Sequence, residues 1–392
     1  MRKGDWSFSE LTSLTSKKME TTLLLYLDFL RFCLDETRGI PDGVGNINWA
    51  DLKEFAKQQA IVGICWQGMS RLGDIKVNKP TDDDVLAWMA LVQKTQKQNS
   101  KLNERTAFVS RTFLNEGFPN CILKGQGNAL YYPDPSLRSS GDIDIWLDGS
   151  REKITHYVKT LCPTAEPIYL HIDFPAVKGA TVEVHYMPSY VNNFWANRRL
   201  QRWFNEEKKR QMSHVVKPQT IPSEDAKDSK HASFTTPTDD FNLVFQLCHI
   251  MHHIFDEGIG LRQLIDYYYL LRHATDVDRE ELRHRLSSFG LRRFARAIMW
   301  IEHEQLGLPE KFLIDEPDEQ AGRVVFDDIL RGGNFGKFND DYERASKRRI
   351  YPRRAWMKLR HSMGLVRYFP GEALSEPFFR MWHFFWRLKN KG

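Results

Sequence analysis

The spacing of apolar residues along the chain changes twice, and each change predicts a different kind of structure. From about residue 18 to residue 116, apolar residues recur three or four positions apart, which places them on one face of a helix. Residues 119 to about 205 hold short runs in which apolar and polar residues alternate, as they do in half-buried strands. After Thr238 the helical period returns and continues nearly to the end of the chain.

Turn and capping residues divide these regions into individual elements. Asn48 or Asp51 is expected to cap a helix in the N-terminal region. Residues 208–237 are rich in charge, serine and proline and predict a long loop, with short strands at 214–216 and 232–235. The sheet region is predicted to hold strands at 121–125, 141–147 and 180–186, and helices at 126–132 and 153–161.

Together these elements predict an α+β protein. Its core is a small mixed β-sheet within residues 119–237, flanked by an N-terminal helical region at 1–118 and a C-terminal helical region at 238–392. The helix at 153–161 is expected to cross between strands of the sheet. A chain of 392 residues exceeds what one hydrophobic core usually fills, so more than one unit is expected.

Two carboxylates, Asp142 and Asp144, stand inside the otherwise apolar run at 141–147. Because side chains alternate along a strand, both carboxylates point to one face of the sheet. Glu183 lies in the strand at 180–186, where it shares a face with His185. Ionised groups that lie side by side repel each other and resist burial, so a fold that gathers them usually offers a cation. Mg²⁺ is the expected ion, because it binds carboxylate and phosphate oxygens together.

The chain before these carboxylates predicts a corner that binds anions. Lys124 and Gly125 end a strand at a glycine turn, and a short helix is expected directly after them. A helix N-terminus and a lysine both favour a phosphate group. Arg138 precedes Asp142 by four residues and is expected either to contact a phosphate or to pair with the aspartates. Carboxylates beside such a corner are the arrangement that metal-assisted nucleotidyl transfer requires.

Four motifs follow one another in this part of the chain. They are Leu-Lys-Gly at 123–125, Leu-Tyr-Tyr-Pro-Asp-Pro at 130–135, Arg-Ser-Ser-Gly-Asp-Ile-Asp-Ile at 138–145 and Val-Glu-Val-His at 182–185. Their order resembles the uncharacterised nucleotidyltransferase family of the DNA polymerase beta-like superfamily. The run from His249 to Asp266 resembles the helical part of the same family, so the resemblance spans roughly residues 119–272. The chain departs from the superfamily at Gln126, where glycine or serine is usual.

The resemblance implies a bacterial enzyme that moves an NMP from an NTP to a hydroxyl group and releases pyrophosphate. The acceptor would be a small molecule, a glycan or a protein. The catalytic residues, which would also hold two Mg²⁺ ions, would be Asp142, Asp144 and Glu183. The residues that bind the NTP would be Lys124, Gly125, Arg138, Gly141 and Arg262. The competing hypothesis is a non-catalytic nucleotide-binding adaptor that docks a membrane or a partner through its C-terminal tail.

Histidines downstream offer a second candidate site. His249 and His253 lie four residues apart on a predicted helix, a spacing that binds a transition metal when a third ligand joins them. The favoured interpretation is that they line the cleft facing the carboxylates or lie within the helical core. Arg262 and Asp266 have the same spacing and are expected to form an ion pair, unless Arg262 faces the substrate. His185 is expected to be a strand-surface or hydrogen-bonded histidine rather than a ligand.

Composition favours a cytoplasmic protein. The five cysteines are odd in number, widely scattered and without a Cys-x-x-Cys pair, which argues against a disulfide framework and a zinc site. No uninterrupted run of about 18 apolar residues occurs, so neither a signal peptide nor a transmembrane span is expected.

Positive charge is concentrated at the C-terminal end. Residues 347–392 hold 12 Lys or Arg and 2 Glu, so this segment carries a net positive charge of ten. The net charge of the whole chain is only +5, and the other residues therefore carry a net negative charge. The segment at 377–389 mixes aromatic residues with cations, as interfacial helices and nucleic-acid surfaces do. Three interpretations stay open: internal packing, peripheral membrane contact, or contact with a polyanion. A nucleic acid is the less favoured partner, because it would need a continuous basic track.

Overall fold

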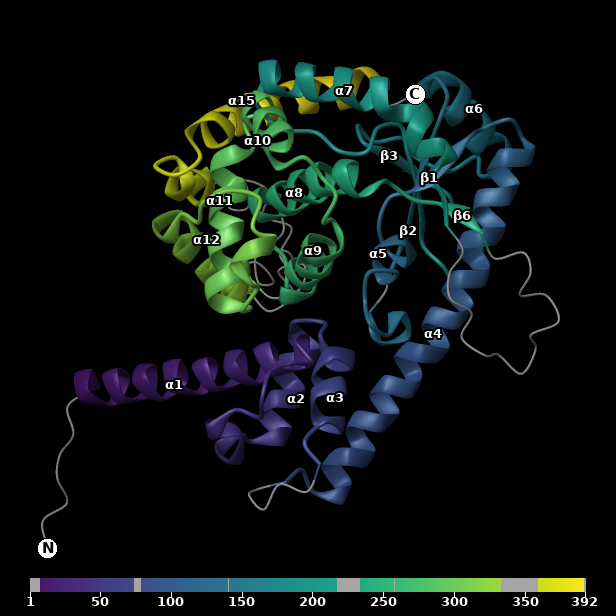
Figure 1. Cartoon of the computed structure of the whole chain (residues 1–392). Helices are drawn as coiled ribbons and strands as arrows, with labels where there is room; N and C mark the ends of the chain where they lie inside the picture. Colours follow the sequence, from purple (N-terminus) through teal and green to yellow (C-terminus); the bar gives the residue numbers. More distant parts are fainter. Residues whose placement is uncertain are drawn as a thin grey trace, which may run out of the picture.

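The computed structural model describes residues 8–73, 79–139, 141–216, 233–256, 258–332 and 359–390. It holds a small four-stranded sheet that lies beside a larger group of C-terminal helices, and the first N-terminal helices lie below that group (Figure 1). The α+β fold with a small mixed sheet is thus confirmed. Among the described residues, no helix is both long enough and apolar enough to cross a membrane.

The N-terminal helices lead into one long helix that supports the sheet. Asn48 caps α2, as predicted, by accepting hydrogen bonds from the backbone N–H groups of Ala50 and Asp51. Thr81 and Asp84 form a capping box at the start of α4, which runs from the N-terminal helices up to the sheet (Figure 1). The helices of this region are α1 (Phe8–Leu34), η1 (Asp42–Asn46), α2 (Trp49–Gln58), α3 (Val62–Ser70) and α4 (Asp82–Asn115).

The main sheet has the strand order β1-β2-β4-β3, in which β2 and β4 are parallel and the other pairs antiparallel. The predicted crossing helix is α6 (Arg151–Leu161), and it joins the strands on the way from β2 to β3. The strands are β1 (Asn120–Ile122), β2 (Ile143–Leu147), β3 (His171–Asp173) and β4 (Val182–His185). Between β1 and β2 lie α5 (Gln126–Ala129) and η2 (Pro135–Leu137), so the first helix is shorter than predicted.

Both faces of β2 are covered. Ile143, Ile145 and Leu147 pack with Val184 of β4 and Phe113 of α4 in one apolar cluster. The opposite face carries Asp144 and Trp146, which are also buried. A strand buried on both faces lies in the interior of a layered fold, so Asp144 is held where water is largely excluded.

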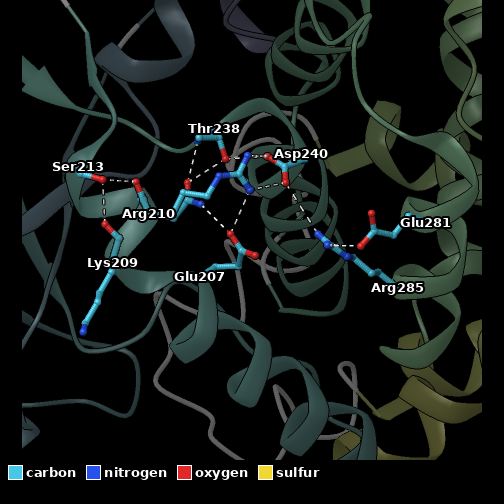
Figure 2. A network of polar contacts seen from close by, with 9 residues as sticks. Glu207, Lys209, Arg210, Ser213, Thr238, Asp240, Glu281 and Arg285 are labelled. Atoms are coloured by element: carbon cyan, nitrogen blue, oxygen red, sulfur yellow. Dashed lines mark hydrogen bonds and ion pairs between the residues drawn. The ribbon is translucent and has the colours of Figure 1, made fainter.

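The prediction of a loop at 208–237 is partly wrong. Helix α7 (Phe194–Ser213) continues through residues 208–213, where Lys208 and Arg210 make ion pairs. Arg210 binds both carboxylate oxygens of Asp240 at 2.8 and 3.0 Å, and Asp240 also accepts a hydrogen bond from Thr238 (Figure 2). The short strands are present as β5 (Val215–Val216) and β6 (Phe234–Thr235), whereas residues 217–232 lie outside the described residues.

The C-terminal helices share one buried apolar cluster with the N-terminal helices. The predicted boundaries after residues 118 and 237 therefore stay predictions. The C-terminal elements are α8 (Asp239–Asp256), α9 (Leu261–His273), α10 (Arg279–Ser288), α11 (Arg292–Trp300), the π-helical η4 (Ile301–Gln305), η5 (Glu310–Phe312), α12 (Glu319–Gly332) and α15 (Pro370–Asn390).

Replacing Glu302 with methionine is expected to stabilise the protein. Its side chain is fully buried, and neither carboxyl oxygen has a hydrogen-bond partner among the described residues. Burial raises the pKa of Glu302 well above its ordinary value, so folding takes up a proton that the unfolded chain lacks at neutral pH. Glu302 therefore lowers the free energy of unfolding progressively as the pH rises from the pKa of this group in the unfolded chain toward its pKa in the folded protein. Glu302→Met should add about 1–3 kcal/mol near pH 7 and less near pH 4.

Urea unfolding at both pH values measures this difference. The matched control is Glu304→Met in the same π-helical segment, because the Glu304 side chain is 55% exposed. It should change stability by less than about 0.5 kcal/mol. Equal effects of the two substitutions, or a gain that does not depend on pH, would contradict the prediction.

Candidate active site

Three carboxylates meet on one face of the sheet. Asp142 directly precedes β2, Asp144 lies within it, and Glu183 lies opposite Asp144 on the parallel strand β4. Each offers a carboxylate oxygen, and these three oxygens lie within 4.8 Å of one another. The structure therefore brings together the three residues that alternation along the strands predicted to share a face.

Two cations offset the charge of these carboxylates. The Nζ atom of Lys124 lies 3.0 Å from Asp144 Oδ1, and His185 Nε2 lies 3.0 Å from the same oxygen and 3.4 Å from Glu183 Oε2. Burial alone would lower the pKa of His185, but its hydrogen bonds to the two carboxylates raise it to about 9. His185 is hence a buried, charged donor, so its expected hydrogen bonding is confirmed and a strand-surface position is not.

The same contacts act on Glu183 and Lys124. Burial would raise the pKa of Glu183, but the hydrogen bond from His185 and the charges of both histidines lower it to about 2. For Lys124, the three carboxylates outweigh the effect of burial and raise its pKa. All three carboxylates are thus held beside positive charge in a site largely screened from water.

The donor set fits a divalent cation. The side chain of Asp144 is fully buried, yet its Oδ2 has no hydrogen-bond partner among the residues that the structure describes. A buried carboxylate oxygen without a donor is a costly arrangement that a bound cation would relieve. Two overlapping groups of residues could hold such an ion, namely Asp142, Asp144 and Glu183, and His171, Glu183 and His185. The first group fits better, because His185 is protonated and a protonated imidazole cannot bind a metal.

His171 was missed by the sequence analysis. It lies on β3, and its Nδ1 is 3.3 Å from Glu183 Oε2. Burial is the main reason that the pKa of His171 is lowered. The sequence carries only a weak indication of this strand, because β3 is three residues long. His171 comes close to Glu183 only through the antiparallel pairing of β3 with β4, which local spacing does not reveal.

Gly125 forms the turn that carries the chain past the carboxylates. Its φ of +63° lies in a region that favours glycine, and a Cβ atom there would lie 3.0 Å from the carbonyl oxygen of Asp142. The side chain of Gln126, which departs from the superfamily pattern, is buried and donates to the side chain of Asn103 on α4. Gly141 is exposed, and no neighbour would obstruct a Cβ atom there.

Arg138 is placed beside the site but pairs with a different carboxylate from those predicted. Its Nε and Nη2 atoms donate to Asp266 at 2.7 and 2.6 Å, and both side chains are buried. Tyr132 also donates to Asp266, at 2.6 Å. The pairing with Asp266 raises the pKa of Arg138 and lowers that of Asp266 despite their burial. Pairing of Arg138 with Asp142 or Asp144 was therefore a wrong expectation, because the helical region supplies a better-placed carboxylate.

Arg262 points to the loop before β2. Its Nη1 donates to the carbonyl oxygen of Ser139 at 2.9 Å, whereas Asp266, four residues on, receives the bidentate bond of Arg138. Burial and the nearby charge of Arg138 lower the pKa of Arg262. Arg138 and Arg262 line a narrow cleft together with Lys124, Gly125, Asp142 and His249.

Of the α8 histidines, His249 lines this cleft, and none of them belongs to a group of described residues that could hold a metal ion. The rings of His249 and His253 are 4.4 Å apart, and neither belongs to the ligand groups found among the described residues. Burial lowers the pKa of both well below the usual value, and the charge of Lys124 adds to this effect. They are neutral imidazoles, and His249 lines the cleft as the sequence analysis favoured.

A family model described as an uncharacterised nucleotidyltransferase matches residues 45–307. The chain belongs to this family. No curated protein and no solved structure matches the chain. The match confirms the resemblance found in the motifs and supports a nucleotidyltransferase activity. It includes every residue of the carboxylate site and of α9, whereas α12 and α15 lie beyond its end.

A larger cavity of about 750 Å³ lies elsewhere in this family member. Gly127, Arg210, Asp239 and Arg285 are among its lining residues, and none of the three carboxylates is. The ion pairs of Figure 2 form part of its wall. Its lining includes acidic residues, but among the described residues these form no group that could hold a metal ion, so we assign the chemistry to the three carboxylates beside the narrow cleft.

Replacing Asp266 with asparagine is expected to destabilise the protein by about 3–5 kcal/mol, because the buried Arg138 guanidinium loses its carboxylate. Urea unfolding followed by circular dichroism measures the change. The control is Asp28→Asn, which removes an ion pair with Arg31 in which Asp28 is 56% exposed, and should cost less than about 1 kcal/mol. An Asp266→Asn protein as stable as the control would contradict the prediction.

Proposed function

We propose that the chain is a divalent-metal-dependent nucleotidyltransferase that moves an NMP from an NTP to a hydroxyl acceptor. The observation that carries this proposal is the gathering of three carboxylates, one of which, Asp144, has a buried Oδ2 without a hydrogen-bond partner among the described residues. Like charges in a buried site are costly unless they bind something positive. The family match supports the general class of reaction.

The carboxylates would hold the cation. Asp142, Asp144 and Glu183 offer the oxygens that Mg²⁺ prefers, and two Mg²⁺ ions are the number we propose. The bound ions would lower the pKa of the acceptor hydroxyl and neutralise charge on the phosphates. Glu183, with a pKa of about 2, stays ionised and is a weak base, so we assign it to ion binding.

The reaction would join the acceptor oxygen to the α-phosphorus of the NTP. The bond from that phosphorus to the oxygen bridging the β-phosphate breaks, pyrophosphate leaves, and the hydroxyl proton passes to solvent. Lys124, which pairs with Asp144, would contact a phosphate once a cation takes over the neutralisation of that carboxylate. Arg262 and Arg138 add positive charge from the side of the cleft.

The nucleotide would lie on the solvent side of the carboxylates. The cleft behind Asp142 measures only about 30 Å³, which is water-sized. Asp142, Glu183 and Lys124 are all partly exposed, so a triphosphate reaches them from outside. Gly125, which is buried, and Gly141, which is exposed, both line the cleft next to Asp142.

Asp142→Asn and Glu183→Gln are each expected to lower turnover by about 10²–10³-fold, because each removes a charge that binds the cation. Pyrophosphate release and intact mass are followed with each of the four NTPs, with and without Mg²⁺. A mixture of polyols, sugars and hydroxyl-bearing peptides supplies the acceptor. The control is Asp148→Asn, just after β2, where the carboxylate pairs with Lys208 at 3.3 Å. It should retain turnover.

Two outcomes would contradict the proposed enzymatic activity. The first is turnover that survives both substitutions at the carboxylates. The second is Mg²⁺-dependent binding of an NTP by the wild-type protein without pyrophosphate release for any acceptor. That result would favour the non-catalytic adaptor.

Divalent cations are expected to raise the Tm of the wild-type protein by a few degrees, since a ligand that binds only the folded state stabilises it. Differential scanning calorimetry with Mg²⁺ or Mn²⁺ against EDTA measures this shift. The double variant Asp142→Asn and Glu183→Gln should lose it, whereas Asp148→Asn should keep it. A shift that persists in the double variant would place the cation elsewhere.

A further inference from the structure

Helix α15 presents a continuous apolar stripe to solvent. The stripe residues recur at alternating steps of four and three, so they lie along one side of the helix. Their exposed fractions range from 52% to 70%. We call this set the α15 stripe, and it comprises Leu374, Phe378, Met381, Phe385 and Leu388.

Another face of α15 packs against the rest of the protein. Phe379 stacks on Tyr190 with ring centroids 4.8 Å apart, and Trp386 meets Tyr169 edge to face at 5.8 Å. Arg380 also pairs with Asp256 at the end of α8, at 3.3 Å. These contacts hold the helix in place, so the α15 stripe is an outer surface of a folded element.

The start of α7 lies beside α15 and carries two further exposed apolar residues. The backbone N–H of Asn192 donates to Glu372 of α15 at 2.7 Å, and the Asn193 side chain donates to Ser375. The helices α7 and α15 consequently lie side by side (Figure 1). Phe194 and Trp195 follow at once and are 68% and 63% exposed.

Cations surround the apolar residues, and acidic residues are missing from the end of the chain. The sequence from Pro377 to Gly392 contains no Asp or Glu. Arg387 and Lys389 are exposed on α15, and Arg198 and Arg202 are exposed on α7. A surface of this charge attracts an anionic partner.

We propose that the α15 stripe, with Phe194 and Trp195, docks on a membrane that contains anionic lipids. Helices that lie in a membrane interface combine exposed Phe, Trp and Leu with flanking Lys and Arg. The apolar side chains enter the headgroup and acyl boundary while the cations bind lipid phosphates.

Other occupants fit the surface less well. A nucleic acid would engage the cations but would leave Leu374, Phe378 and Leu388 in water. A second copy of the same face would bring cations against cations. The combination of apolar stripe and positive charge therefore favours a lipid surface.

The docking helix adjoins the helix that lines the cleft. Besides the ion pair of Arg380 with Asp256, Tyr190 contacts His252 of α8 with ring centroids 4.7 Å apart. His249, one turn earlier on α8, lines the cleft beside Asp142. A membrane-bound molecule would thus hold its carboxylate site near the lipid surface. The docking itself does not depend on the proposed reaction.

Cosedimentation of the full chain with sucrose-loaded vesicles tests the proposal. One set of vesicles holds two parts phosphatidylcholine to one part phosphatidylglycerol, and the other holds phosphatidylcholine alone. The protein is expected to partition to the anionic vesicles about tenfold more strongly, and added salt should weaken this binding. Inorganic phosphate at millimolar concentration should not compete, which separates a lipid surface from a free phosphate site.

The variant Phe385→Ser with Leu388→Ser removes two stripe residues and should weaken binding about tenfold. Arg387→Gln with Lys389→Gln should also weaken binding about tenfold, because it removes two of the charges that an anionic surface attracts. The matched control is Leu86→Ser with Phe108→Ser on α4, at 58% and 56% exposure, which should bind as the wild type does. Circular dichroism checks that every variant is folded.

Three results would overturn the proposal. One is the absence of binding to either kind of vesicle. Another is binding that the stripe and charge variants leave unchanged. The third is self-association in light scattering that the stripe variant abolishes while no vesicle binding is seen, which would assign this face to a second copy of the chain.

Discussion

Mutual repulsion among Asp142, Asp144 and Glu183 is the constraint around which the site is arranged. Parallel pairing of β2 with β4 places Asp144 opposite Glu183, and burial of β2 on both faces removes the water that would screen them. Lys124 and His185 supply two positive charges within 3.4 Å, but one oxygen of Asp144 has no donor among the described residues. The site is therefore neutralised only in part, which is why a cation fits it.

The helical regions hold the corner of the chain that faces these carboxylates. Arg138 ties the segment before β2 to Asp266 of α9, and Asn99 of α4 donates to the carbonyl oxygens of Ser136 and Arg138. Asn128 of α5 accepts from Gln246 of α8. These buried polar contacts come from three helices, so the geometry of a sheet of four short strands depends on the packing of the helices around it.

The carboxylate site and the exposed apolar stripe occupy different parts of the chain. The family match ends at residue 307, after the carboxylates and α9, whereas the exposed apolar stripe belongs to α15 beyond it. Contacts of α15 with Tyr190 and Asp256 join the two parts through α8. The proposed reaction site thus lies within the matched segment, whereas the proposed docking surface combines α15 beyond the match with Phe194 and Trp195 inside it.

The sequence by itself determined the α+β class, the three carboxylates and the glycine corner. Alternation along strands is local, and the left-handed φ of Gly125 is a property of a single residue. Only the tertiary structure decided that Arg138 pairs with Asp266, that His171 approaches Glu183, and that one face of α15 is exposed. Each of these depends on contacts between residues far apart in the chain, because partner choice follows from the packing of whole elements rather than from local spacing.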